Sequence, residues 1–155
     1  ITHPSGLVVA AIVAVNAGGD IIDPSTGKVV AGVRNPDNTF SDARAILRAG
    51  AFQRPRAGEN TTIGLVATNA KLTKTQATRM ALMADDGYAR AISPSHTHGD
   101  GDTIFAIATG RWDGAANITS IGALAAEAMA QAVVRAATQA TGLPDIPAVR
   151  DLKNK

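Results

Sequence analysis

Three apolar runs constrain the fold of this chain more than any other feature of its sequence. The first, LVVAAIVAV at residues 7–15, is ended by AGGD at 17–20. The other two are TTIGLVAT at 61–68 and TIFAIATG at 103–110. Runs that are rich in β-branched residues and bounded by turn residues predict strands. The first run is about half as long as a membrane span, so it predicts a buried strand.

The segment between the first two runs predicts a hairpin and a short helix. IID at 21–23, the turn PSTG and KVVAGV at 28–33 give the hairpin pattern. SDARAILRAG predicts a helix with Ser41 as its N-cap and Gly50 just after its end. The next residues, AFQRPRAGEN, combine Pro, Gly and charge without a period and predict a loop.

Two longer helical patterns follow the second and third runs. Thr73 and Gln76 form a capping box, and the helix that they begin carries one face of Ala77, Met80, Ala81, Ala84 and Tyr88. An Ala-rich segment beginning at Ile118 predicts a long helix that stops at Gly142, followed by a loosely packed tail. Only 3% of the residues are aromatic, so the core must consist of small and aliphatic side chains. Together these patterns predict a layered α/β or α+β fold within a single domain.

Composition and charge weigh against several classes of function. The net charge is +2 with positive residues scattered among acidic ones, so we expect no nucleic-acid partner. No stretch reaches the roughly 18 apolar residues of a membrane span, so we expect no membrane partner either. Cysteine is absent, which fits a reducing compartment and leads us to expect a cytoplasmic protein. The opening ITHPSG lacks Met and a basic segment, so we expect a processed or truncated chain without a signal peptide.

The loop HTHGDGD at 96–102 imitates the beginning of a zinc-binding motif. His96, His98 and Asp100 match the H-x-H-x-D pattern of the metallo-β-lactamases. Catalytic zinc usually takes three protein ligands, yet the only other histidine is His3. A calcium loop fails as well, because the position that requires a bidentate Glu is Arg111. We therefore predict no metal and no other cofactor.

Two interpretations are open for the acidic pair of this loop and for Asn16. Side chains two residues apart in an extended segment point the same way, so Asp100 and Asp102 can converge to orient a nucleophile or hold an ammonium. The alternative is a solvated turn in which Asp102 caps backbone amides. Asn16, directly after the first run, either donates its amide N–H to an oxyanion or begins the turn at Gly18-Gly19.

Thr61 in the stretch ENTTIGLVAT is a candidate nucleophile. A threonine hydroxyl is a poor nucleophile unless a base is adjacent. An α-amine, with an unperturbed pKa of about 7.7 to 8.0, supplies such a base when Thr61 becomes a chain N-terminus. Attack of the Thr61 hydroxyl on the Asn60 carbonyl, followed by hydrolysis of the ester, would expose that amine. The alternative is that Asn and Thr simply occupy the point where a loop becomes a strand.

The order of these motifs resembles one family. ENTTIGLVATNAKLTKTQATRMALMADDGYARAI followed by SPSHTHGDGDTIFAIATG is similar to the C-terminal half of the DmpA-type aminopeptidases and nylon-oligomer hydrolases. The upstream segment GLVVAAIVAVNAGGDIIDPSTGKVVAG resembles the family's strand-Asn-turn region. The resemblance covers residues 7 to about 135 in the family's order.

This resemblance implies an N-terminal nucleophile hydrolase of the αββα DmpA/ornithine-acetyltransferase type, which cleaves itself and then hydrolyses amide bonds of small peptides or amino-acid oligomers. It implies that Asn60–Thr61 is the scissile bond and Thr61 the nucleophile, with Asn16 at the oxyanion site and Asp100 and Asp102 near the nucleophile. Residues 1–60 would then be the end of the α chain and residues 61–155 the β chain.

The chain also departs from the family pattern. Roughly the first half of the family's precursor has no counterpart here, so we expect an upstream polypeptide, which forms the rest of the α chain, as a required partner. The resemblance further implies a homo-oligomer of αβ units. Two alternatives are open: a non-catalytic relative that keeps the fold for assembly, and an acyltransferase that uses an amino-acid acceptor in place of water.

Overall fold

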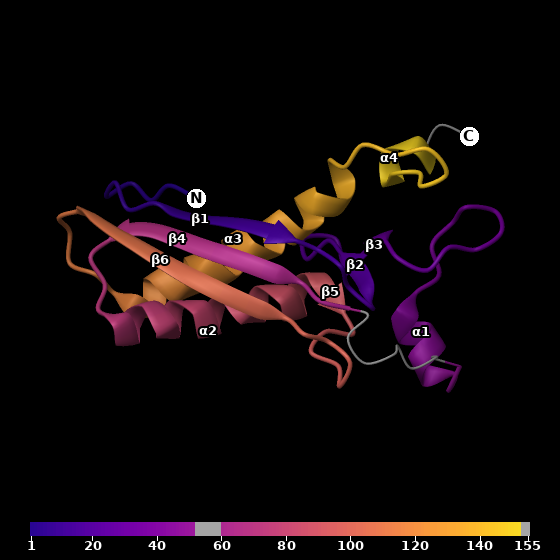
Figure 1. Ribbon diagram of the computed structural model, residues 1–155, viewed down its shortest axis with the longest axis horizontal. Coiled ribbons are helices and arrows are strands. Elements are labelled where there is room, and N and C mark those ends of the chain that lie inside the picture. The colour runs from indigo at the N-terminus through magenta and orange to yellow at the C-terminus, as the bar shows by residue number, and fades with distance from the viewer. Residues whose placement is uncertain (52–59, 153–155) are drawn as a thin grey trace.

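The main sheet has three strands, and β4 lies in its centre. The computed structural model describes residues 1–51 and 60–152. β1 (Val9–Ala14) pairs antiparallel with β4 (Ile63–Ala70), and β4 pairs parallel with β6 (Thr103–Trp112). Figure 1 shows the order β1-β4-β6. All three predicted strands are therefore present, although β4 begins two residues later than its apolar run.

A second, smaller sheet contains the predicted hairpin. β2 (Asp20–Ile22) pairs antiparallel with both β3 (Val29–Ala31) and β5 (Ile92–Ser93). Asp20 is buried, and its carboxylate accepts N–H bonds from Val33 and from Ala43. A buried carboxylate with two backbone donors is well compensated, and it fixes the segment after β3 to β2.

Two long helices cover one face of the main sheet. α2 (Lys74–Ala91) and α3 (Ile118–Thr138) pack against each other and against the strands, as Figure 1 shows. A Cβ at Gly87 would lie 2.6 Å from the carbonyl oxygen of Ala126, so glycine is what permits this close helix approach. The core between these layers consists mainly of aliphatic residues and methionines, among them Val9, Val66, Met80, Ala84, Ile121, Ala125, Met129 and Val133. The predicted layered α+β fold class is confirmed, and helices on one face of a sheet are consistent with an αββα sandwich.

The predicted capping box of α2 is confirmed, whereas the predicted cap of the short helix is wrong. The Thr73 hydroxyl accepts the Gln76 N–H, and the Gln76 side chain accepts the Thr73 N–H. α1 (Ala43–Arg48) has Asp42 as its N-cap because that carboxylate accepts the Arg44 N–H. The Ser41 hydroxyl instead donates to the Asn35 side chain.

The predicted end of the long helix is also wrong, whereas most residues of the tail that follows it are exposed, as expected for a loosely packed segment. α3 ends at Thr138 rather than at Gly142, and its C-cap is Gln139. The chain then forms α4 (Val149–Leu152), and Ala148 before it is buried. The Asp151 carboxylate accepts the Ala148 N–H at 2.8 Å and so closes this last turn. The predicted loop AFQRPRAGEN lies outside the described residues except at its two ends.

The other face of the main sheet carries large apolar side chains. Ile12 is 69% exposed and Phe105 59% exposed, so the prediction that the first run is a buried strand is wrong for this face of β1. Ile12 pairs with Leu65 and Leu65 with Phe105, which aligns the three across the sheet. Ile63 and Ile107 extend the same face. No helix in residues 1–51 or 60–152 has both the length and the apolarity to cross a membrane.

Candidate active site

Three segments that are distant in the sequence meet at Thr61. Its N–H donates to the carbonyl oxygen of Asn16 at 2.9 Å, which joins the segment after β1 to the residues before β4. Asn60 forms an isolated parallel bridge with Asp100. The N–H of Gly101 donates to the Asn60 carbonyl oxygen at 3.0 Å. The structure therefore brings all five predicted site residues, Asn16, Asn60, Thr61, Asp100 and Asp102, into one neighbourhood, and their roles stay predictions.

The Thr61 side chain lies against the bond that precedes it. Its Oγ1 donates to the Asn60 carbonyl oxygen at 2.7 Å, while that oxygen also accepts the Gly101 N–H. A Cβ at Gly101 would lie 2.8 Å from Thr61 Oγ1, so the hydroxyl occupies space that only glycine leaves free. On the other side, a Cβ at Gly18 would lie 2.8 Å from the Asn60 side-chain nitrogen. Gly101 thus lies against the Thr61 side chain, and Gly18 lies against the Asn60 side chain.

The two carboxylates of the acidic pair make different contacts. Asp102 is largely buried, and its Oδ1 accepts the Thr62 N–H at 2.8 Å. Asp100 Oδ2 accepts the Thr97 N–H at 2.7 Å. The other oxygen, Asp100 Oδ1, is buried and has no hydrogen-bond partner among the described residues. A buried carboxylate oxygen of this kind favours an added donor, and a nearby ammonium would supply one.

A further acidic residue, Asp85 on α2, joins this region through His96. His96 Nε2 lies 3.8 Å from Asp85 Oδ2, and His96 Nδ1 lies 3.7 Å from Asp102 Oδ2. Burial raises the pKa of Asp85, and the neighbouring His96 opposes this shift. Burial also raises the pKa of the Tyr88 phenol, with Asp102 and Asp85 adding to the effect, so this group stays neutral. The sequence contains no spacing signal that links Asp85 to the loop.

Thr62 differs from Thr61 and provides a matched control for it. Its side chain is fully buried, and its Oγ1 has no hydrogen-bond partner among the described residues. Thr62→Val removes this uncompensated hydroxyl while keeping the shape of the side chain. We expect the free energy of unfolding to rise by about 1 kcal/mol, measured by denaturant unfolding. A loss of stability in Thr62→Val would show that the hydroxyl has an acceptor in solution.

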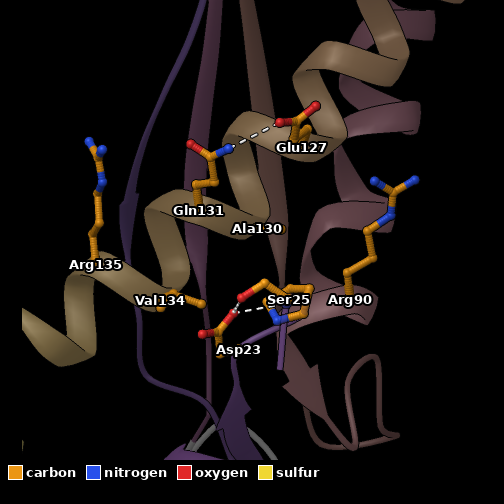
Figure 2. A pocket seen from close by; sticks show the side chains of 9 residues that line it. Asp23, Ser25, Arg90, Glu127, Ala130, Gln131, Val134 and Arg135 are labelled. Atoms are coloured by element: carbon orange, nitrogen blue, oxygen red, sulfur yellow. Dashed lines mark hydrogen bonds between the residues drawn. The ribbon is translucent and has the colours of Figure 1, made fainter. Parts of the chain in front are cut away.

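A cavity of about 570 Å³ lies away from this site, between the β2–β3 turn, the end of α2 and α3. Figure 2 shows its polar lining, including Asp23, Ser25, Arg90 and Glu127. The Ser25 hydroxyl donates to Asp23 Oδ1 at 2.7 Å. This hydrogen bond holds the pKa of Asp23 below its ordinary value, and the lining contains none of the five predicted site residues. The groups around Thr61 therefore define the candidate site better than this cavity does.

Known proteins are similar to this chain over half of its length or more. An uncharacterized aminopeptidase of Mycobacterium leprae is 37% identical over 95% of this chain and 45% of its own length. A 6-aminohexanoate-oligomer endohydrolase of a Kocuria species is 36% identical over 50% of this chain and 25% of its own length. The chain thus spans less than half the length of either protein. A solved β-aminopeptidase of a Burkholderia species is similar over 89% of this chain and 43% of that one, with a TM-score of 0.45 and 22% identity.

The profile of one protein family matches the chain almost from end to end. The matched region covers residues 2–147 and therefore contains β1, the residues around Asn60–Thr61 and the acidic loop. By this match, the chain belongs to peptidase family S58.

Proposed function

We propose that this chain carries the nucleophile of an autoprocessing N-terminal-threonine amidohydrolase that cleaves small peptides or amino-acid oligomers. The observation that carries the proposal is the setting of the Asn60–Thr61 peptide. The Thr61 hydroxyl lies 2.7 Å from the Asn60 carbonyl oxygen, and the Gly101 N–H donates to the same oxygen. A backbone donor on a carbonyl oxygen stabilises the negative charge that nucleophilic attack creates there.

The proposed self-cleavage has two steps. Thr61 Oγ1 bonds to the Asn60 carbonyl carbon, the C–N bond of the peptide breaks, and the hydroxyl proton goes to the Thr61 nitrogen. The product is an ester with a free α-amine on Thr61. Water then adds to the ester, which releases the Asn60 carboxylate and restores the Thr61 hydroxyl. The chain is divided into residues 1–60 and 61–155.

Substrate hydrolysis uses the same hydroxyl with the new amine as its base. The α-amine accepts the hydroxyl proton as Thr61 Oγ1 attacks the substrate carbonyl, and the protonated amine then gives that proton to the leaving amine. The side-chain amide of Asn16 stabilises the tetrahedral oxyanion. Asp100 Oδ1, buried without a partner among the described residues, accepts an N–H from the Thr61 ammonium. Water hydrolyses the acyl-enzyme and completes the cycle.

Intact-mass measurement of the purified protein tests the processing step directly. We expect two polypeptides whose masses correspond to cleavage between Asn60 and Thr61. Aminoacyl anilides and 6-aminohexanoate oligomers are suitable substrates, because the related proteins bear aminopeptidase and oligomer-endohydrolase names. A single uncut chain that hydrolyses these substrates would contradict the proposal. Turnover only when an amino-acid acceptor is added would favour the acyltransferase instead.

We further propose that an upstream polypeptide packs a second sheet onto the exposed face of the main sheet. The chain spans 45% of the length of its mycobacterial relative, which leaves more than half of that protein unmatched. The exposed face is apolar across three strands, with Ile12, Leu65 and Phe105 in one row. An extended apolar sheet face of this kind suits face-to-face packing with another sheet about 10 Å away.

Phe105→Lys tests this interface. The affinity of the chain for its upstream polypeptide is expected to fall roughly 100-fold, because a lysine at the centre of an apolar interface loses its hydration. Co-purification of the two polypeptides reports this loss. Leu82→Lys is the matched control, since Leu82 on α2 is 60% exposed and lies on the helical layer. Two results would contradict this interface. Both variants could weaken binding equally, or Phe105→Lys could break a dimer of the chain with itself.

A further inference from the structure

His96 occupies an unusual position between two carboxylates from different parts of the fold. One ring nitrogen faces Asp85 on α2 at 3.8 Å, and the other faces Asp102 at 3.7 Å. A neutral imidazole carries a proton on only one nitrogen, whereas the imidazolium carries one on each. The ring of His96 therefore places one nitrogen beside each carboxylate, and at least one of these nitrogens carries an N–H.

The backbone of His96 supports a specific role for this residue. Its φ angle is +54°, in the left-handed region that non-glycine residues rarely adopt. Such a conformation persists only where the surrounding contacts hold it, and it occurs preferentially at functional sites. The Tyr88 ring also flanks the imidazole, with ring centroids 6.4 Å apart. The Tyr88 phenol stays neutral, and the carboxylates that face His96 within the described residues are those of Asp85 and Asp102, with Asp86 acting on Asp85.

Asp102 connects His96 to the nucleophile. Its two oxygens are divided between two partners: Oδ1 accepts the Thr62 N–H at 2.8 Å, and Oδ2 faces the imidazole. The contacts thus run from α2 through His96 and Asp102 to the residue that follows Thr61. Because Asp102 has only about 10% of its side chain exposed, water offers little alternative solvation to this carboxylate.

We infer that His96 is a positioning residue, whose imidazole links Asp102 to α2 so that Asp102 fixes the backbone at Thr61–Thr62. The effect on catalysis rests on the proposed function, whereas the effect on the Thr62 N–H does not. Loss of the ring leaves Asp102 without this partner and loosens the peptide that carries the nucleophile. A nucleophile that is misplaced by even a fraction of an ångström reacts more slowly without any change in substrate contacts.

The first test measures the Thr62 amide without relying on activity. Residue-resolved hydrogen exchange is recorded for the protein assembled with its upstream polypeptide, on a Thr61→Ala background that keeps the chain uncut. In His96→Gln the Thr62 amide is expected to exchange about tenfold faster than in the parent, because the charge-assisted bond to Asp102 weakens. Asp102→Asn is the positive control. His98→Gln, in the same exposed loop, is the matched control and should leave the rate unchanged. Unaltered Thr62 exchange in His96→Gln overturns the inference.

The second test uses the nucleophilic protein and separates positioning from binding. His96→Gln is expected to lower both the processing rate and kcat about tenfold while KM changes less than about twofold. The double variant with Asp85→Asn should be no slower than His96→Gln alone, because both changes interrupt the same chain of contacts. Independent losses that multiply, or a change confined to KM, overturn the inference. If Thr62 exchanges faster in His96→Gln but the protein with Thr61 intact never cleaves itself, the positioning role is retained and the proposed function is rejected.

Discussion

Thr61→Ala is expected to give one uncut chain and to lower amide hydrolysis by three orders of magnitude or more. The substitution removes the hydroxyl that lies 2.7 Å from the Asn60 carbonyl oxygen, and with it the nucleophile for both self-cleavage and turnover. Loss of a nucleophile costs on the order of 10³ to 10⁶ in rate in serine hydrolases. Intact mass reports the first effect, and release of amine from an aminoacyl anilide reports the second.

Two variants distinguish loss of the hydroxyl from damage to the fold. Thr61→Ser keeps the nucleophile and should restore both cleavage and turnover at a reduced rate. Thr62→Val changes the adjacent threonine, whose hydroxyl has no partner among the described residues, and should cleave normally. Cleavage that persists at the same position in Thr61→Ala would assign the reaction to a contaminating protease or to another residue.

Gly101→Ala is expected to slow self-cleavage by about 100-fold. A Cβ at this position would lie 2.8 Å from Thr61 Oγ1, which is closer than real Cβ contacts, so the hydroxyl or the loop must move. Displacement of a reacting atom by about 1 Å costs roughly 100-fold in rate. The appearance of the fragment that begins at Thr61 would be followed by mass spectrometry over time.

The control for this variant lies in the same loop. His98 is exposed and two residues from Asp100, so His98→Ala should cleave at the parental rate. The melting temperature of Gly101→Ala should remain close to that of the parent, because Gly101 is exposed apart from its contact with Thr61. Normal cleavage kinetics in Gly101→Ala would mean that the hydroxyl has more room than the structure indicates.

Local patterns in the sequence were sufficient for the main elements of the fold. The capping box at Thr73 and Gln76 fixes the start of α2, because both reciprocal bonds lie within four residues. The alternation of apolar runs and small-residue helices predicted a layered fold of the observed class. The predicted N-cap of α1 was wrong by one residue, because Ser41 and Asp42 are both good caps by type; Asp42 caps the helix, and the Ser41 hydroxyl donates to Asn35.

Local sequence patterns could not predict the features that depend on tertiary contacts. A continuous apolar run such as residues 7–15 carries no information about which face of its strand the same chain covers. The site residues were placed by resemblance to a family rather than by spacing. Asp85 was missed because nothing in ADDGY indicates that this carboxylate lies 3.8 Å from His96. His96 itself was considered only as an imitation of a zinc ligand.

The central position of β4 has a consequence for the folding of a cleaved protein. A cut before Thr61 would leave β1 on one fragment and its hydrogen-bonded neighbour β4 on the other, with Val9 of the first fragment inside the core of the second. The two fragments would stay associated, but their folding would have become a second-order reaction. Stability would then depend on concentration, and chains diluted after denaturation would re-form the native sheet slowly or not at all. Cleavage in this fold would convert a reversible folding equilibrium into a largely one-way assembly.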